Sequence, residues 1–262
     1  MIKHLKAIYY FFRLQYEKLK FFFSINWIKT LYFNFKMLPY ETAKKLPFYF
    51  YGSVKFTSLK GSVQIEAPIK RGMIGFGQAY EMTTRSSKMA EIVLKGQIIF
   101  RGYGQFGKDC FLMVGNNAVL DFGNMAGMAS RGKLICTDEI TLKTYARIGS
   151  ECQVVDTDFH QMINTETGER YEVTKPITIG AYNYVGRWTS LLKGAVTPDY
   201  CTIASNTLCN KDYSHLGSNI LIGGIPAKLL KTNISRDWEG ERAMLEKSLL
   251  LENRFKVTKG NH

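Results

Sequence analysis

The stretch IGAYNYVGRWTSLLKGAVTPDYCTIASNTLC, residues 179–209, repeats one kind of residue every six positions. The recurring residues are Ile179, Val185, Leu191, Thr197, Ile203 and Cys209. Small or compact residues stand four positions after them, at Asn183, Thr189, Ala195, Cys201 and Thr207. A period of six matches neither an α-helix nor a simple alternating strand. It predicts a solenoid in which each unit forms one flat side of a triangular coil and each coil buries its apolar corner against the next.

The same register extends upstream. It continues as Leu142, Ile148 and Val154 with Ala146 and Cys152 at the small position, and earlier as Leu94, Phe100, Phe106 and Val114, Leu120, Ala126. Glycine follows the aliphatic residue at Gly149, Gly180 and Gly186, where a side chain would crowd the corner or a positive φ would be required. We therefore expect one β-helix domain over residues 51–231.

Composition narrows the choices. The chain has 262 residues, 45% hydrophobic, and a net charge of +13, which suits nucleic acid, an anionic membrane surface or a phosphorylated ligand. Its five cysteines form no C-x-x-C pair, so a disulfide framework or a cysteine-rich zinc site is not expected and a cytoplasmic location fits. We find no secretory signal and no run approaching the roughly 18 apolar residues that span a bilayer.

Residues 1–50 form a basic, aromatic extension with 16 of the 35 aromatic residues and nine Lys or Arg against two Glu. Helical steps of three and four connect Leu5, Ile8, Phe12, Tyr16, Leu19 and Phe23. We expect one or two amphipathic helices from Ile2 to about Lys36, ending near Pro39 and Pro47. These helices either pack on the protein or lie in a membrane interface. Nucleic acid is not expected, because no helix-turn-helix, finger or RNP-like pattern accompanies the charge.

Residues 232–262 form the third segment, a C-terminal helix and tail. Ser235 to Val257 is predicted to be a charged amphipathic helix that starts at a Ser235 cap and packs across a coil edge. Its apolar residues are Trp238, Met244, Leu245, Leu249 and Leu251.

Several motifs resemble the left-handed β-helix, hexapeptide-repeat acyltransferases, and within them the sugar O-acetyltransferase branch. They are the repeat itself, the segment Asp156-Thr-Asp-Phe-His160, the block Ile177-Thr-Ile-Gly-Ala-Tyr-Asn-Tyr-Val-Gly186 and the terminator Ile222-Gly-Gly-Ile-Pro-Ala-Lys228. The resemblance covers roughly residues 90–231. Leu31 to Pro39 and Leu46-Pro47 further resemble the N-terminal extension of bacterial polysaccharide acetyltransferases from capsule or surface-glycan loci. The resemblance implies a mainly β, left-handed parallel β-helix that transfers acetyl from acetyl-coenzyme A to a sugar hydroxyl.

Among the four histidines, only His160 interrupts the coil register, and the polar, repeat-free segment Gln161 to Lys175 follows it. A hydroxyl that attacks a thioester must lose its proton, and a neutral imidazole accepts one near pH 7. We therefore expect His160 to be the general base. Asp158 would share a face with it in an extended segment and steady its imidazolium, although turn aspartates commonly bond only the local backbone, which is the alternative for Asp156 as well.

Other chemistries are less favoured. A cysteine nucleophile needs an exposed thiol with a lowered pKa, whereas Cys152, Cys201 and Cys209 occupy inward positions of the repeat. A zinc site of the β-helical carbonic anhydrase kind needs three convergent histidines, and His4, His215 and His262 are not placed to supply them. No metal is expected.

The resemblance implies a set of donor-binding positions. They are Arg187, Ser205, Asn210, Lys211, Lys228 and Lys231. Arg187 stands where the galactoside enzyme has a small polar residue, and lysine replaces arginine at 228 and 231, so the charge is kept and the bidentate geometry is lost. Trp188 would stack on a ligand ring or fill a seam between subunits.

On the acceptor side, Asp138 maps near the family's sugar-binding acid, with a turn role as the alternative, and Tyr145 or Phe159 would be neighbours of His160. The resemblance also implies a homotrimer with active sites at the subunit seams and a saccharide or lipid-linked glycan as acceptor. Two other functions stay open: an N-acetyltransferase of an amino sugar nucleotide, and a catalytically silent scaffold. Peripheral attachment to the inner face of the membrane is open too.

Overall fold

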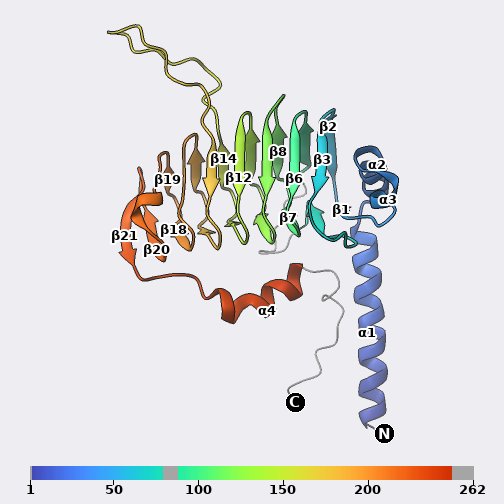
Figure 1. The fold of residues 1–262 in the computed structure, drawn as a ribbon. Coiled ribbons are helices and arrows are strands. Elements are labelled where there is room, and N and C mark those ends of the chain that lie inside the picture. Colours follow the sequence, from blue (N-terminus) through green and yellow to red (C-terminus); the bar gives the residue numbers. More distant parts are fainter. Residues whose placement is uncertain (1, 79–87, 250–262) are drawn as a thin grey trace.

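The chain winds into a parallel β-helix of three sheets, with helices at its N-terminal end and along one side (Figure 1). The structure, a computed structural model, describes residues 2–78 and 88–249. Successive strands enter the three sheets in turn, and each strand pairs in parallel with its counterpart one coil away. The predicted fold class, a left-handed parallel β-helix with an α-helical N-terminal extension and a C-terminal helix, is confirmed.

We name the sheets I, II and III. Sheet I contains β1 (Phe48–Phe50), β4 (Ile74–Phe76), β7 (Gly104–Phe106), β10 (Ala126–Met128), β13 (Arg147–Ile148), β16 (Tyr184–Val185), β18 (Cys201–Ile203), β20 (Ile220–Gly223) and β21 (Lys228–Thr232). Sheet II contains β2 (Val54–Leu59), β5 (Ala90–Leu94), β8 (Phe111–Val114), β11 (Lys133–Cys136), β14 (Gln153–Val155), β17 (Ser190–Leu192) and β19 (Leu208–Cys209). Sheet III contains β3 (Ser62–Ile65), β6 (Gln97–Phe100), β9 (Val119–Phe122), β12 (Glu139–Leu142) and β15 (Ile177–Ile179). Bridges from Thr178 to Val196 and from Val196 to Asp212 carry sheet III further along the coil.

The six-residue repeat marks the inward positions of the coil, as predicted. All of the recurring residues from Ile179 to Cys209 are buried, and so are the small residues between them. The upstream positions Leu142, Ile148 and Val154 are buried as well. The periodicity therefore identifies the side chains that fill the triangular core.

The corner glycines act through crowding. A Cβ added at Gly149, Gly180 or Gly186 would lie 2.3–2.7 Å from a backbone atom of the next coil. Positive φ occurs instead two residues later, at Glu151, Tyr182 and Trp188, with values of 53–63°. The glycine thus permits close approach of neighbouring coils, while the left-handed turn is made by a residue with a side chain.

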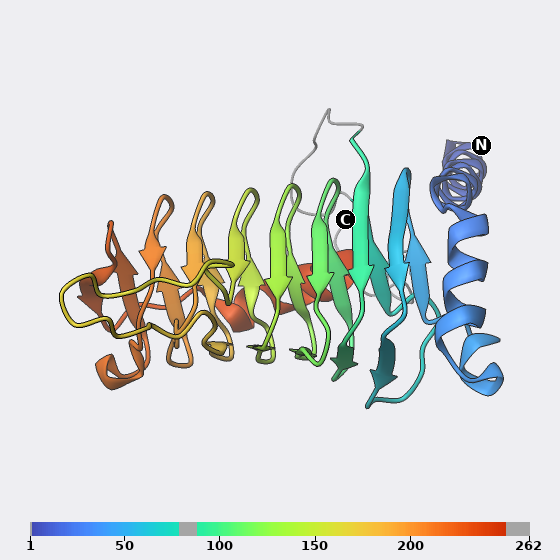
Figure 2. The same ribbon diagram turned by 90° about the horizontal axis from the view of Figure 1, so that it is seen from above.

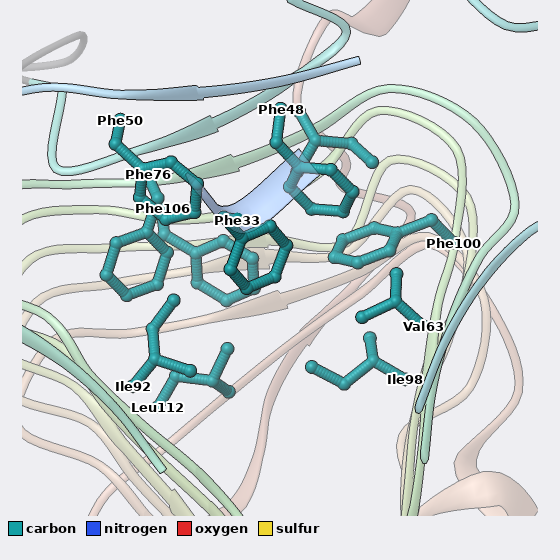
Figure 3. A pocket seen from close by; sticks show the side chains of 11 residues that line it. Phe33, Phe48, Phe50, Val63, Phe76, Ile92, Ile98, Phe100, Phe106 and Leu112 are labelled. Atoms are coloured by element: carbon teal, nitrogen blue, oxygen red, sulfur yellow. The ribbon is translucent and has the colours of Figure 1, made fainter. Parts of the chain in front are cut away.

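The N-terminal coils have an aromatic core (Figure 3). Phe48, Phe50, Phe76, Phe100 and Phe106 fill the triangle, and neighbouring ring centroids lie 5.2–5.9 Å apart. Phe33 reaches into this cluster from outside the coil, 4.8 Å from Phe48 and 4.9 Å from Phe50. Burying rings of this size makes the cluster a large source of stability at this end of the molecule.

Three helices close that end. They are α1 (Ile2–Ser24), α2 (Trp27–Met37) and α3 (Tyr40–Ala43), in the region where helices were predicted. Asn26 ends the first and caps the second, because its side chain accepts a hydrogen bond from the backbone N–H of Lys29 at 3.1 Å.

Helix α2 satisfies the open edge of the first strand. The backbone N–H groups of Phe48 and Phe50 donate to the buried side chains of Asn34 and Thr30, each at 3.1 Å. The Asn34 amide in turn donates to the Phe48 carbonyl at 2.9 Å. An unpaired strand edge would otherwise be open to other chains, so α2 terminates the β-helix with side chains in place of a strand.

At the other end, β21 turns back and pairs antiparallel with β20, which protects the last edge. Helix α4 (Trp238–Leu249) then runs back along the coil (Figures 1 and 2). Trp238 is buried edge-on against Tyr145 and Tyr182, which stack 5.1 Å apart at an angle of 7°.

The start of α4 differs from the prediction. Asp237, not Ser235, caps it, since its carboxylate accepts a hydrogen bond from the Gly240 N–H at 2.9 Å. The predicted end at Val257, and the apolar residue Leu251, lie outside the described residues.

Candidate functional site

An arm leaves the coil at the corner between sheets II and III, after β14 and before β15. Its two sides are joined by antiparallel bridges from Thr157 to Thr174 and from Ile163 to Arg170. The arm projects away from the coil (Figure 1) and extends over its C-terminal part when seen from above (Figure 2). The repeat-free segment Gln161 to Lys175 is therefore a paired arm mounted on the coil at one corner.

His160 lies at the base of this arm and is exposed. Among the residues that the structure describes, no hydrogen bond or ion pair engages its imidazole. Both ring nitrogens are thus free to meet a substrate. An exposed imidazole on a rigid corner has the access that a general base requires.

Asp158 is paired with a lysine of the next coil. Its Oδ2 lies 2.5 Å from Nζ of Lys193, whose side chain is only 20% exposed. The prediction that Asp158 and His160 share a face assumed an extended backbone, whereas Phe159 between them has φ 60°, which turns the chain. In this chain the carboxylate therefore fixes the arm to the coil.

Lys193 is a residue that the sequence reasoning missed. Its ammonium also donates to the Glu172 carbonyl at 2.5 Å, on the returning side of the arm. One cation thus holds both sides of the arm at its base. The signal was its register: Lys193 follows β17 at the corner where Asp158 follows β14, one coil apart.

Asp156 has the structural role that was the alternative for it. It is fully buried, and its carboxylate accepts hydrogen bonds from the backbone N–H groups of Thr137 and Asp138 and from the Thr137 hydroxyl, all at 2.8–2.9 Å. These bonds fix the corner of the preceding coil. They also place Asp138, half-buried, beside the base of the arm.

The corner between sheets II and III therefore carries a row of polar residues on successive coils. Asp138 precedes the arm by one coil, Lys193 follows it by one, and Asn210 and Lys211 follow it by two. Asn210 and Lys211 are exposed. These predicted donor and acceptor residues share one edge of the coil with His160.

Arg187 and Ser205 lie on a different edge, the corner between sheets I and II. Arg187 donates to Glu151 at 3.1 Å, and Arg131 reaches the same carboxylate at 2.7 Å. The Arg187 guanidinium also covers the exposed Trp188 ring at 4.4 Å. A hydrogen bond involving Trp188, followed by those two cations, holds the pKa of Glu151 below its ordinary value.

Lys228 and Lys231 stand on β21, at the C-terminal end of sheet I, and both are exposed. The predicted donor set is therefore divided over two corners and one sheet end of a single chain. Tyr145 also lies elsewhere than expected: it is buried at the corner between sheets III and I, against Trp238.

The five cysteines are free and buried. Burial raises the pKa of Cys110, Cys201 and Cys209 to about 12 in each case, and burial with the nearby Asp156 raises that of Cys136 as well. A thiol of this kind is protonated and inaccessible at neutral pH, which disfavours a cysteine nucleophile. Over the described part of the chain, no three His, Cys, Asp or Glu side chains are grouped to hold a metal ion.

Solved structures with similar folds include acyltransferases. The polySia specific acetyltransferase NeuO has 19% sequence identity and a TM-score of 0.45, over 71% of this chain and 88% of its own. The polysialic acid O-acetyltransferase OatWY has 22% identity and a TM-score of 0.41, over 70% and 90%. AntD, an N-acyltransferase from Bacillus cereus in complex with dTDP and coenzyme A, has 15% identity and a TM-score of 0.39, over 82% and 98%. No family model matches the sequence, and no curated protein is similar to it.

Proposed function

We propose that this protein transfers an acetyl group from acetyl-coenzyme A to a sugar hydroxyl of a bacterial capsular or surface-glycan precursor. One observation carries the proposal: His160 is exposed, with both ring nitrogens free, at the base of an arm that a buried network fixes to one corner of the coil. The sequence resemblance to sugar O-acetyltransferases supports it.

The chemical step needs little more than a base and orientation. His160 takes the proton of the acceptor hydroxyl as that oxygen bonds to the thioester carbonyl carbon. The carbon–sulfur bond then breaks, and the imidazolium returns the proton to the departing thiolate. Backbone N–H groups are sufficient to stabilise the oxyanion of the intermediate.

The donor carries phosphate groups, and the cations near the site suit them. Lys211 stands on the edge of His160, while Lys228 and Lys231 extend the positive charge toward the C-terminal end. Arg187 and Ser205 complete the set from the neighbouring corner. Lysine ammonium groups bind phosphate as point charges, without the planar fork of arginine.

The active unit in this proposal is a homotrimer. The arm exposes Phe159, Met162, Ile163 and Tyr171 to between 49% and 55%, more apolar surface than a solvated hairpin needs. One chain also keeps Arg187 and His160 on opposite edges of sheet II. A seam between two chains would cover the arm and bring one chain's edge to the other's.

Asp158 and Asp138 have supporting roles in the proposal. Asp158, through Lys193, holds the arm in place, so that His160 meets the acceptor in one orientation. Asp138 lies beside the arm base and would hydrogen-bond acceptor hydroxyls. The division into an extension at 1–50, a catalytic β-helix at 51–231 and a C-terminal segment at 232–262 describes how these roles are distributed.

The proposed setting is the cytoplasm, with the N-terminal extension in contact with the inner face of the membrane. Every described helix is too short or too polar to cross a bilayer. Contact would therefore be peripheral, through the basic and aromatic side chains of residues 1–50.

The test is incubation with radiolabelled acetyl-coenzyme A and a panel of sugars, nucleotide sugars and lipid-linked glycans. We expect label in a saccharide, and mild base should release it, because esters hydrolyse where amides do not. Base-stable label in an amino sugar would support the N-acetyltransferase instead. No transfer to any member of the panel, from protein that is folded and binds coenzyme A, would count against the proposal.

A further inference from the structure

The outer surface of the N-terminal helices is apolar and has no partner within the described chain. On α1, Tyr9, Phe12, Tyr16, Leu19 and Phe23 follow steps of three and four and are exposed to between 56% and 74%. On α2, Ile28, Leu31, Tyr32 and Phe35 form a second stripe, with Ile28 exposed to 81%. We call these two stripes together the end face.

The end face points away from the coil along its axis. The opposite side of α2 is fixed to the first strand by Thr30, Phe33 and Asn34, so the outer stripe faces outward. Both helices run across the coil axis at its N-terminal end (Figures 1 and 2). A flat surface laid against that end would meet both helices along their lengths.

Helix α1 is fixed to this end and cannot swing freely. Ile25, just after it, bridges to Tyr51, and Phe21 packs 6.1–6.4 Å from the rings of Tyr49 and Tyr51. The Trp27 indole N–H donates to the Phe22 carbonyl at 3.0 Å across the junction. The end face therefore has a defined orientation relative to the arm.

The charges around the end face favour anionic lipid over a second copy of α1. The stripe has coiled-coil spacing, and the positions beside it are Arg13 and Lys20 on one side and Gln15 and Phe22 on the other. Parallel pairing normally sets acids opposite such cations, and here none is available. Lys29 and Lys36 add positive charge on α2. Cations beside aromatic side chains suit the headgroup depth of an anionic bilayer.

We propose that the protein stands end-on on an anionic membrane, with the coil axis along the membrane normal. This proposal rests on the function proposed above and gives its site a height. The arm leaves the coil four strand spacings beyond the first strand of sheet II, which is about 19 Å at the usual spacing of parallel strands. The acceptor would then be a lipid-linked saccharide long enough to span that height, rather than the sugar next to the lipid.

Vesicle flotation of the full chain tests the surface. We expect binding to vesicles of phosphatidylglycerol and phosphatidylcholine in equal parts, weaker binding at high salt, and little to phosphatidylcholine alone. The combined change Ile28→Ser, Leu31→Ser and Phe35→Ser should reduce binding at least about tenfold, since it removes the apolar contact that each buried side chain supplies. The matched control, Ile225→Ser, Leu229→Ser and Leu230→Ser at the far end, should bind like the unaltered chain.

A fluorescent probe tests the orientation. All five native cysteines are buried, so a cysteine introduced as Ile28→Cys or Leu230→Cys is labelled selectively with an environment-sensitive dye. We expect a blue shift on anionic vesicles for the probe at 28 and none for the probe at 230. A shift at both positions would mean that the coil lies flat, and absence of binding at low salt would overturn the proposal. Acetyl transfer to a water-soluble acceptor, measured on the same samples, shows whether the proposed function stands independently.

Discussion

The two ends of the β-helix are built from different side chains. The N-terminal coils are filled by phenylalanines and closed by Phe33 of α2, whereas the C-terminal coils hold Ile, Val, Leu and small residues in an unbroken six-residue register. The regular end carries the arm and the polar corner. The comparison indicates that strict repetition provides a rigid mount for chemistry, while the aromatic end provides closure and stability.

The largest expected effect is on stability, at the aromatic end. Phe33→Ala removes a buried ring from a cluster that α2 closes, and such truncations cost about 3–5 kcal/mol. Denaturant unfolding of the full chain measures it. Turnover per folded molecule should not change, because the arm lies several coils away. A large loss of turnover with little loss of stability would break the proposed division between the two ends.

At the regular end we expect the opposite behaviour. Lys193→Gln removes the cation that holds both sides of the arm, so turnover should fall about tenfold, in line with the cost of misplacing a catalytic group. The free energy of unfolding should change by less than about 1 kcal/mol, because pairs of this exposure contribute little. Lys175→Gln, which removes an exposed cation at the same arm, is the control and should leave turnover unchanged.

A smaller effect concerns the donor. Replacing Lys211, Lys228 and Lys231 together by Gln should raise KM for acetyl-coenzyme A several-fold, and raise it more than KM for the dephospho-coenzyme A thioester. Replacing Lys60, Lys95 and Lys133, which stand toward the aromatic end and at β11, should change neither constant. Equal increases for both donors would mean that the three lysines do not read the terminal phosphate.

The smallest effect at neutral pH is on the cysteines, which should not react. Cys110, Cys201 and Cys209 have pKa values raised to about 12 by burial. The unfolded chain loses thiol protons at lower pH than the folded chain does, so the free energy of unfolding should be constant below about pH 8.5 and fall as pH rises toward 12. Thiol labelling in native buffer and in denaturant checks the first point. Rapid labelling of the native protein would contradict the buried placement.

Much of this architecture could be predicted from sequence, because a repeat states the same constraint many times. Ile179, Val185 and Leu191 sit in equivalent environments, so one rule places all of them. His160 was noticed for the complementary reason, that it breaks the register. The helical extension followed from its apolar spacing, and its boundary at Asn26 follows capping chemistry.

Features that depend on contacts distant in sequence could not be predicted. The capping of β1 by Thr30 and Asn34 needs the helix already placed on the strand edge. The pairing of Asp158 with Lys193 spans the whole arm, and it replaces the expected contact with His160 because Phe159 turns the backbone. Ser235 was a plausible cap, but the return of the chain along the coil moved the helix start to Asp237.

The central claim is that His160 is the base of an acetyl transfer, and comparing His160→Ala with His215→Ala tests it most directly. Both residues are exposed histidines, and only one stands on the arm. With an acceptor that the unaltered protein acetylates, the account predicts a roughly 10²–10⁴-fold loss of turnover for His160→Ala, unchanged coenzyme A binding, and no loss for His215→Ala. Full turnover by His160→Ala, or equal losses in both variants, would contradict it.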